Sequence, residues 1–420
     1  MISITDTKLK RYGALFALIL AGEVIFSLPF HIPRFFRPTM LEVFQLSNTQ
    51  LGDIFAVYGV VALLAYFPGG AIADRYSARS LITLSLVATS LGGFYLSTKP
   101  SLNGLYLLFA YWGLTSILLF WAALIKATRD WGGHQTQGLA FGLLDGGRGL
   151  VASVLATLAM ILLGSGLAST GSDAVALEAV ILFYSVITLL TAAVIWFALP
   201  HHQPQNTASS SGGRSSWRDV LGRPSVWLQA GVVICAYCGY KSLDNYGVYA
   251  VQVLGMSPLE AAALNTYASY ARPVAAIAAG LWADRWLSSR VVAVSFFCGG
   301  AAFFWLSRGA APAMAQGILL ANILVTFFAV YALRGIYFSL IEEAGLDRRI
   351  TGSAVGLISV LGFTPDVFFA AVTGRILDAN PGAIGFQHYF LLIALICIAG
   401  MMFTLLLSRL LARHKQPANS

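Results

Sequence analysis

Charged residues are scarce in this sequence. Asp, Glu, Lys and Arg together make up 10% of its 420 residues, whereas soluble domains carry about 25%. Apolar and aromatic residues make up 58%. A chain of this length with so few charges lacks the surface that a water-soluble protein needs. The composition therefore argues against a cytosolic enzyme, a disordered protein and a nucleic-acid-binding protein.

Cysteine and histidine are also rare, with four and six residues. Cys235 and Cys238 have the spacing of a redox motif, but they lie in the apolar run VVICAYCGY and are expected to pack as small hydrophobic residues. The histidines show no metal-ligand spacing, and no nucleophile–base set or Walker motif occurs. We therefore expect no metal site, no cofactor, no enzymatic activity and no nucleotide-driven pump. Residues 1–10 contain no long apolar stretch, so we expect no cleaved signal peptide.

Long apolar runs are the main feature that is present. About 20 apolar residues, at roughly 1.5 Å per residue, cross a hydrocarbon core of about 30 Å as a helix. Twelve such runs predict an all-α integral membrane protein with twelve transmembrane helices. The predicted spans are 11–31, 50–73, 79–97, 102–126, 137–163, 176–199, 225–250, 258–283, 289–307, 312–341, 350–377 and 386–411.

The stretch 200–224 is the least apolar long segment. It is rich in Ser, Gly, Pro and Gln and has no hydrophobic periodicity, so we expect a flexible cytoplasmic linker. The linker divides the predicted helices into an N-terminal six-helix bundle (1–199) and a C-terminal six-helix bundle (225–420).

The net charge of +8, from 26 Lys and Arg against 18 Asp and Glu, has a topological explanation. If the N-terminus lies inside, most basic residues outside the helices fall on the cytoplasmic side, as the positive-inside rule requires. We therefore expect both termini in the cytoplasm, and the charge does not indicate a nucleic-acid partner. The basic residues on the opposite side are Arg34, Arg37, Lys99, Arg308 and Arg375.

The two halves of the chain repeat each other. GAIADR at 70–75 ends the second predicted helix, and GLWADR at 280–285 ends the eighth. GLAFGL at 138–143 and GSAVGL at 352–357 form a second similar pair at nearly the same separation. Two such repeats indicate an internal duplication of parallel halves.

These motifs resemble those of the major facilitator superfamily, whose signature after the second helix is approximately G-x-x-x-D-R-x-G-x-R-R. The segment 70–80 reads GAIADRYSARS, with Ser77 in place of the second Gly and Ser80 in place of a terminal base. The resemblance covers essentially the whole chain. It extends to a bacterial branch called YihN-like, nitrate/nitrite-transporter-like or sugar-phosphate-permease-like, through FWAALIKATRDW (120–131), GLAFGLLDGGRGL (138–150), YALRGIYFSLIEEAG (331–345) and GLISVLGFTPDVF (356–368).

The resemblance implies a multi-pass transporter of the bacterial inner membrane that works by alternating access around a site between two six-helix bundles. It also implies that charged residues at the cytoplasmic ends of the second and eighth helices form contacts in only one conformation and so gate the cycle. The simpler alternative is that these residues only anchor helix ends. The candidates are Asp74, Arg75, Arg79, Asp284 and Arg285.

Charged residues inside the predicted helices cost about 2.5–3.5 kcal/mol each on insertion scales, so each is a candidate functional residue. Guanidinium groups offer a planar fork to carboxylate, phosphate or nitrate, which predicts an anion site. Arg148 and Lys241 could instead be neutralised by Asp145 and Asp244, three residues away on the same helix. Arg334 could instead pair with an acid of a neighbouring helix. The candidate substrate-binding residues are Arg148, Lys241, Arg272, Arg334 and Tyr270.

Three acids, Glu23, Asp244 and Asp366, are candidates for proton coupling. Glu23 lies near the middle of the first predicted helix, flanked by Gly22 and apolar residues, although it could serve only to hydrogen-bond a neighbouring helix. Asp366 follows Pro365, which removes a backbone N–H and favours a hinge or a simple kink.

The sequence thus favours a secondary transporter for a small anionic solute, driven by protons or by exchange, acting as a monomer in the lipid bilayer. The anion would lie between Arg148, Lys241 and Arg272, and Glu23 would change its protonation state. One alternative is efflux of amphipathic or cationic drugs or metabolites, which Glu23 and Asp244 would attract. Another is a receptor or sensor on the same scaffold, which would bind a ligand without moving it.

Overall fold

The computed structural model describes residues 4–133, 137–200, 219–309, 316–344 and 348–415. The regular elements in these ranges are all helical, which confirms the all-α prediction. The chain folds as two compact units. The first comprises Met1–Gln205, Asp244–Val251 and Gly255–Tyr270, and the second comprises Asn206–Leu243, Gln252–Leu254 and Ala271–Ser420.

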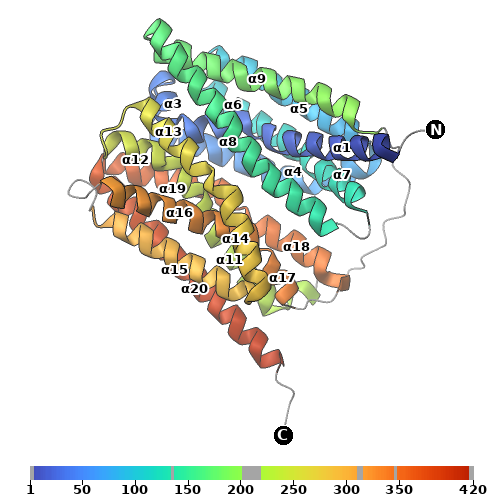
Figure 1. Ribbon diagram of the computed structural model, residues 1–420. Helices are drawn as coiled ribbons and strands as arrows, with labels where there is room; N and C mark the ends of the chain where they lie inside the picture. Colours follow the sequence, from blue (N-terminus) through green and yellow to red (C-terminus); the bar gives the residue numbers. More distant parts are fainter. Residues whose placement is uncertain (1–3, 134–136, 201–218, 310–315, 345–347, 416–420) are drawn as a thin grey trace. The chain divides into compact units, whose positions relative to one another are not determined.

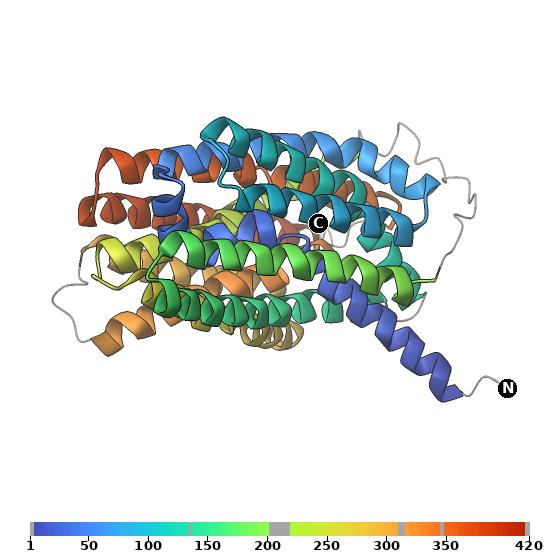
Figure 2. The ribbon, with the colours of Figure 1, turned by 90° about the horizontal axis from the view of Figure 1, so that it is seen from above.

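The first unit joins helices from both halves of the sequence. α5 and α8 each pack along α9 (Figures 1 and 2). Its elements are α1 (Ile4–Val24), η1 (Ser27–His31), α2 (Ile32–Phe35), α3 (Arg37–Val43), α4 (Asn48–Arg75), α5 (Ala78–Ser97), α6 (Leu102–Gly113), η2 (Leu114–Trp121), α7 (Ala122–Gly132), α8 (Gln137–Thr170), α9 (Asp173–Ala198), α12 (Tyr246–Gln252) and α13 (Pro258–Ser269).

The second unit is built from helices of the second half alone. α20 packs along α15 and also contacts α11 (Figure 1). Its elements are α11 (Pro224–Ser242), α14 (Ala271–Arg285), α15 (Ser288–Ser307), α16 (Gln316–Ile336), α17 (Ser339–Glu343), α18 (Arg348–Gly362), α19 (Pro365–Ala379) and α20 (Ala383–Lys415).

The predicted bundles 1–199 and 225–420 differ from these units, because α12 and α13 group with the first unit. The two-bundle division therefore stays a prediction. Most of the predicted linker, residues 201–218, lies outside the described residues.

In the described part of the chain, nine helices are long and apolar enough to cross a membrane. A tenth span results if Arg11–Val24 and Ser27–Phe35, which bend by 41° at their junction, count as one. The predicted spans 225–250, 258–283, 312–341 and 350–377 are not continuous helices. The 3-10 turn η3 (Leu243–Asn245) interrupts the first, and a break at Tyr270 interrupts the second. The total of twelve spans stays a prediction.

Proline explains two of the helix breaks. Pro273 has no N–H, so it cannot donate to the carbonyl of Ser269, the residue at which α13 ends. Pro365 likewise cannot donate to the carbonyl of Leu361, which accepts instead from the hydroxyl of Thr364 at 2.6 Å.

The break after α11 has no proline. Here the freed carbonyl of Ser242 accepts from the Tyr389 hydroxyl at 2.7 Å. Backbone that leaves the helical pattern inside a membrane protein needs such substitute partners, and it is typical of ligand and ion sites. Charged residues stand beside each of these three breaks, namely Lys241 and Asp244, Arg272, and Asp366.

Gly113 allows α6 and α4 to approach closely. A Cβ at this position would lie 2.9 Å from the carbonyl oxygen of Tyr58 and 3.1 Å from Cβ of Val61. We expect Gly113→Ala to cost about 1–3 kcal/mol through overpacking and to lower the thermal unfolding midpoint of the purified protein in detergent.

Gly13→Ala is the matched control, because nothing lies within 4 Å of its added Cβ. There alanine should be neutral or should stabilise the helix by up to about 1 kcal/mol. Equal midpoints for the two variants would contradict the close approach at Gly113.

Candidate functional site

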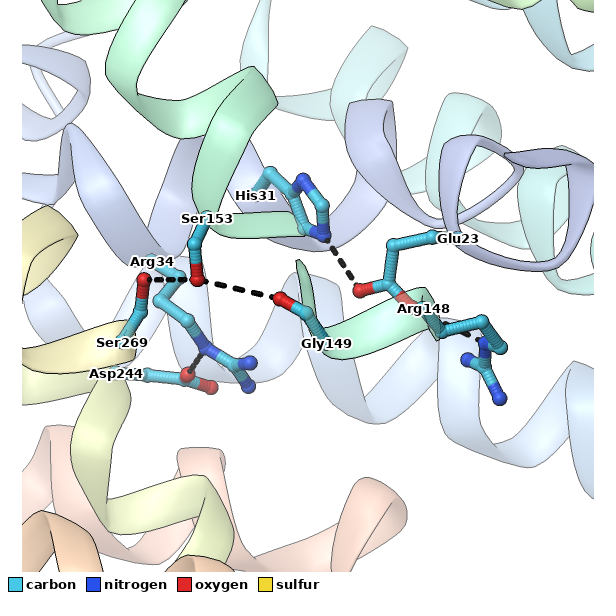
Figure 3. A network of polar contacts seen from close by, with 8 residues as sticks. All are labelled: Glu23, His31, Arg34, Arg148, Gly149, Ser153, Asp244 and Ser269. Atoms are coloured by element: carbon cyan, nitrogen blue, oxygen red, sulfur yellow. Dashed lines mark hydrogen bonds and ion pairs between the residues drawn. The ribbon is translucent and has the colours of Figure 1, made fainter. Parts of the chain in front are cut away.

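Glu23 lies at the centre of a buried ion-paired cluster in the first unit (Figure 3). Its Oε1 accepts a hydrogen bond from Nε2 of His31 at 3.1 Å, and its Oε2 accepts one from Nε of Arg148 at 3.1 Å. Glu23, His31 and Arg148 are 4%, 3% and 7% exposed. Glu23, which has no charged neighbour along its helix, is thus held between two basic side chains from η1 and α8.

Aromatic rings enclose the basic side chains of this cluster. The His31 ring makes edge contacts with Phe35 and Tyr184, at centroid distances of 5.6 and 5.9 Å. The guanidinium carbon of Arg148 lies 5.7 Å from the ring centroids of both Phe26 and Trp121. These apolar walls exclude water, so the charges interact more strongly than they would at a surface.

Gly22 gives Arg148 its path to Glu23. A Cβ on Gly22 would lie 3.2 Å from Cδ of Arg148, tighter than most real contacts. Glycine at this position therefore lets the long side chain from α8 run across the surface of α1.

A second ion pair of the first unit joins Arg34 to Asp244 (Figure 3). Nε of Arg34 donates to Oδ1 of Asp244 at 2.5 Å, and Nδ2 of Asn265 donates to the Arg34 carbonyl at 3.2 Å. Arg34 and Arg37 are 9% and 1% exposed. Both arginines are thus buried inside the protein, and their predicted place in an outer connecting segment stays a prediction.

Hydroxyl groups link α8 to α13 beside these ion pairs. The Ser153 and Ser269 hydroxyls lie 2.8 Å apart, and Ser153 is also within hydrogen-bond distance of the Gly149 carbonyl at 3.2 Å (Figure 3). Tyr270, a predicted substrate-binding residue, has its hydroxyl 2.9 Å from Oγ1 of Thr157. The structure thus brings Tyr270 to the same face of α8 as Ser153, one helical turn further along.

The second unit contains its own charged cluster. Nζ of Lys241 lies 3.3 Å from Oδ1 of Asp366, and the Tyr237 hydroxyl donates to Oδ2 of Asp366 at 2.9 Å. The guanidinium of Arg334 lies 4.0 Å from the ring centroid of Tyr240. This cation–π contact holds the plane of Arg334 on an aromatic face. Arg272 is buried in the first turn of α14.

Sequence reasoning identified the basic residues but not their partners. Arg148 and Lys241 pair with Glu23 and Asp366, which lie on other helices, beyond the neighbours that helical spacing suggested. It also missed His31, Arg34 and Arg37. Their signal was the segment HIPRFFR (31–37), which places three basic residues among aromatics and proline at the end of the first apolar run.

The five predicted gating residues lie in more open surroundings. In the first unit, Oδ1 of Asp74 is 4.0 Å from Nζ of Lys126, and the guanidinium of Arg79 lies 4.0 Å from the ring centroid of Trp196. Arg75, Asp284 and Arg285 are exposed. Their gating role stays a prediction.

An acid meets a helix N-terminus in the second unit. The Ser289 N–H and hydroxyl donate to the two carboxylate oxygens of Glu343 at 2.8 and 2.7 Å. A negative charge there is stabilised by the dipole of α15.

The chain belongs to the Major Facilitator Superfamily, whose sequence pattern matches residues 19–321. It is 29% identical to the inner membrane protein YihN of Escherichia coli (strain K12), over 97% of this chain and 98% of that protein. It is 22% identical to the hexuronate transporter of Bacillus subtilis (strain 168), over 81% and 82% of the two chains.

A solved structure shares the fold. It is a bacterial homologue of the human lysosomal transporter Spinster in an inward-facing, unoccupied conformation, with a TM-score of 0.75 at 14% identity over 99% of this chain and 100% of that one. The predicted family, the transporter rather than enzyme class, and the location as a multi-pass protein of the bacterial inner membrane are thereby confirmed.

The Lys241–Asp366 pair gives a test of the second cluster. The Lys241 side chain is 3% exposed and that of Asp366 is 18% exposed. Asp366→Asn leaves a deeply buried ammonium without its carboxylate, so we expect a loss of about 3–5 kcal/mol in the free energy of unfolding. Lys241→Met leaves a carboxylate that partly reaches solvent, so its loss should be smaller.

The double variant should unfold at a higher temperature than Asp366→Asn alone, because it contains neither charge. Thermal unfolding midpoints of the four proteins in one detergent check this order. Additive losses in the double variant would show that the two side chains do not interact.

Proposed function

We propose that this protein moves a small organic anion across the inner membrane by alternating access, driven by protons or by exchange for another anion. The observation that carries the proposal is an excess of basic over acidic side chains among its buried residues. Membership of a transporter family supports movement of the anion rather than binding alone.

Among the described residues that are less than a tenth exposed, the permanently basic side chains outnumber the acidic ones. The acids are Glu23 and Asp244, and Asp366, at 18% side-chain exposure, adds a third. Net charge inside a membrane is costly, so such an excess suits a protein whose charge balance is completed by an anion. The basic residues are Arg34, Arg37, Arg148, Lys241 and Arg272.

We assign Arg148 to binding the carboxylate of the substrate. We assign Glu23 to controlling whether Arg148 is available for that carboxylate. Glu23 and a substrate anion would compete for the same guanidinium, since the Nε of Arg148 donates to Glu23. A neutral carboxyl group accepts a weaker hydrogen bond than a carboxylate does. A proton taken up at Glu23 would therefore release Arg148 for the anion.

The other predicted residues keep their roles as parts of this proposal. Lys241, Arg272, Arg334 and Tyr270 would contact the anion, and the stacking of Arg334 on Tyr240 favours a fixed guanidinium plane. Asp244 and Asp366 would contribute to coupling through their ion pairs with Arg34 and Lys241. The gating residues would be Asp74, Arg75, Arg79, Asp284 and Arg285.

A sugar acid of the hexuronate type is the first substrate class to test. The Bacillus subtilis relative is named a hexuronate transporter. A hexuronate has one carboxylate for a guanidinium and several hydroxyls for groups such as those of Ser153 and Tyr270. Efflux of cations has less support, because the acids that would attract a cation, Glu23 and Asp244, are both held by arginines.

Removing the charge of Arg148 tests the assignment. We expect Arg148→Gln to lower the uptake of radiolabelled D-glucuronate into proteoliposomes by at least about tenfold, because a hydrogen bond to a charged group contributes about 1.5–3 kcal/mol. Arg148→Lys keeps the charge and should retain part of the activity.

Arg308→Gln is the matched control, since Arg308 is an exposed arginine at the end of α15. Its uptake should equal that of the wild type. Unchanged uptake by Arg148→Gln would refute the assignment, and broad drug resistance without anion uptake would favour the efflux alternative.

A further inference from the structure

His31 has no role in the function proposed so far, yet it shares the carboxylate of Glu23 with Arg148 (Figure 3). It lies at the end of η1, and the chain bends by 41° at the junction between α1 and η1. The bend lets a residue eight positions after Glu23 face back toward it. A histidine with a purely structural role would not need to share a buried carboxylate with a buried arginine.

We propose that His31 binds the coupling proton together with Glu23 and thereby sets the stoichiometry at one proton per negative charge of the substrate. The inference rests on the proposed function and deepens it, because it names the coupling ion and the residue that accepts it.

Charged and titratable groups face His31 from the elements packed against it. α1 contributes Glu23, α8 contributes Arg148 through Glu23, and α9 contributes Tyr184, whose ring contacts that of His31. α2 contributes Arg34, which pairs with Asp244. α5 has no charged side chain from Leu81 to Ser97. Among these types of group, only an imidazole ordinarily titrates between about pH 5 and 8.

When a monovalent anion is bound at Arg148, the charges of the cluster and the anion sum to zero only if the cluster also holds one extra proton. With a neutral His31, the carboxylate of Glu23 and the guanidinium of Arg148 sum to zero. One added proton, bound by the imidazole or shared between Nε2 and Oε1 of Glu23, leaves the cluster with one positive charge. A monovalent anion at Arg148 restores neutrality, so the proton and the anion each favour binding of the other.

The stoichiometry has a consequence for the driving force. Symport of one proton with one monovalent anion moves no net charge. A gradient of one pH unit should then accumulate the anion up to about tenfold, since one unit corresponds to about 1.36 kcal/mol. The membrane potential should have no effect on this accumulation.

The experiment uses D-glucuronate in proteoliposomes containing the full chain. Exchange of labelled for unlabelled anion is measured at equal pH, and accumulation is measured under a pH gradient with and without a potassium–valinomycin potential. His31→Gln keeps a side-chain N–H for Glu23 but cannot take up the proton. The matched control is His388→Asn, which changes an exposed histidine of α20.

We expect the wild type and His388→Asn to show exchange and to accumulate the anion up to about tenfold per pH unit, independently of potential. His31→Gln should retain exchange, which also shows that it is folded, and should lose the accumulation driven by pH. His31→Asn is the second variant if the glutamine variant does not exchange.

The outcomes separate the two proposals. Wild-type accumulation in His31→Gln, or wild-type exchange without a response to pH, would overturn the role of His31 and leave the proposed function standing. Loss of exchange in both His31 variants as folded proteins would also overturn it, since His31 would then serve the anion itself. No exchange by the wild type of this or any other organic anion would overturn the proposed function, and this inference with it.

Discussion

A carboxylate that is removed from water must be surrounded by hydrogen-bond donors, and around Glu23 this requirement determines the course of the chain. The donors come from His31 and Arg148, each 3.1 Å away. To supply them, the chain bends after α1 so that η1 turns back, and Gly22 gives room to the arginine from α8. If the carboxylate of Glu23 takes up a proton and loses its charge, its interactions with His31 and Arg148 become weaker. In the proposed mechanism, this structural requirement would couple a proton to a change at Arg148.

The same constraint applies in the second unit with different residues. Asp366 is held by Lys241 and Tyr237 next to the break at Pro365, and the Thr364 hydroxyl replaces the N–H that this proline lacks. Each unit therefore combines an acid that is buried or largely buried, a basic partner from another helix and a nearby departure from regular helix. Such departures are tolerated at membrane depth only where other groups satisfy the backbone. The breaks are consequently stable features around the charged residues rather than local disorder.

Much of the fold follows from the sequence, because apolar runs of spanning length and the repeated GxxxDR-type segments need no knowledge of tertiary contacts. The breaks were harder to predict. Residues 225–250 form one apolar run, yet the chain turns at η3, where no proline marks the change. Pro365 marks a real break beside Asp366, where we left a hinge and a simple kink open, and Pro273 marks another break that we did not predict. Hydropathy reports how apolar a segment is, not whether its backbone hydrogen bonds are continuous.

In the candidate site, too, the sequence indicated the residues but not their contacts. Because a charge inside a membrane costs free energy, the sequence alone pointed to four charged residues one by one. They are Glu23, Arg148, Lys241 and Asp366. The sequence could not show which of them would meet, since Glu23 and Arg148 are 125 residues apart and pair only through the packing of α1 on α8. His31 was overlooked because it is the last residue of the apolar run 11–31 that we took as the first helix. The His31 side chain reaches Glu23 because the chain bends between α1 and η1.

The central claim is that Glu23 and the substrate anion compete for Arg148 and that a proton decides between them. The most direct measurement is the dissociation constant of D-glucuronate for the purified protein as a function of pH. If binding of one anion takes up one proton, the constant should fall by about tenfold for each unit that the pH decreases above the range in which the cluster titrates. A dissociation constant that is independent of pH, or that rises as the pH falls, would contradict the account.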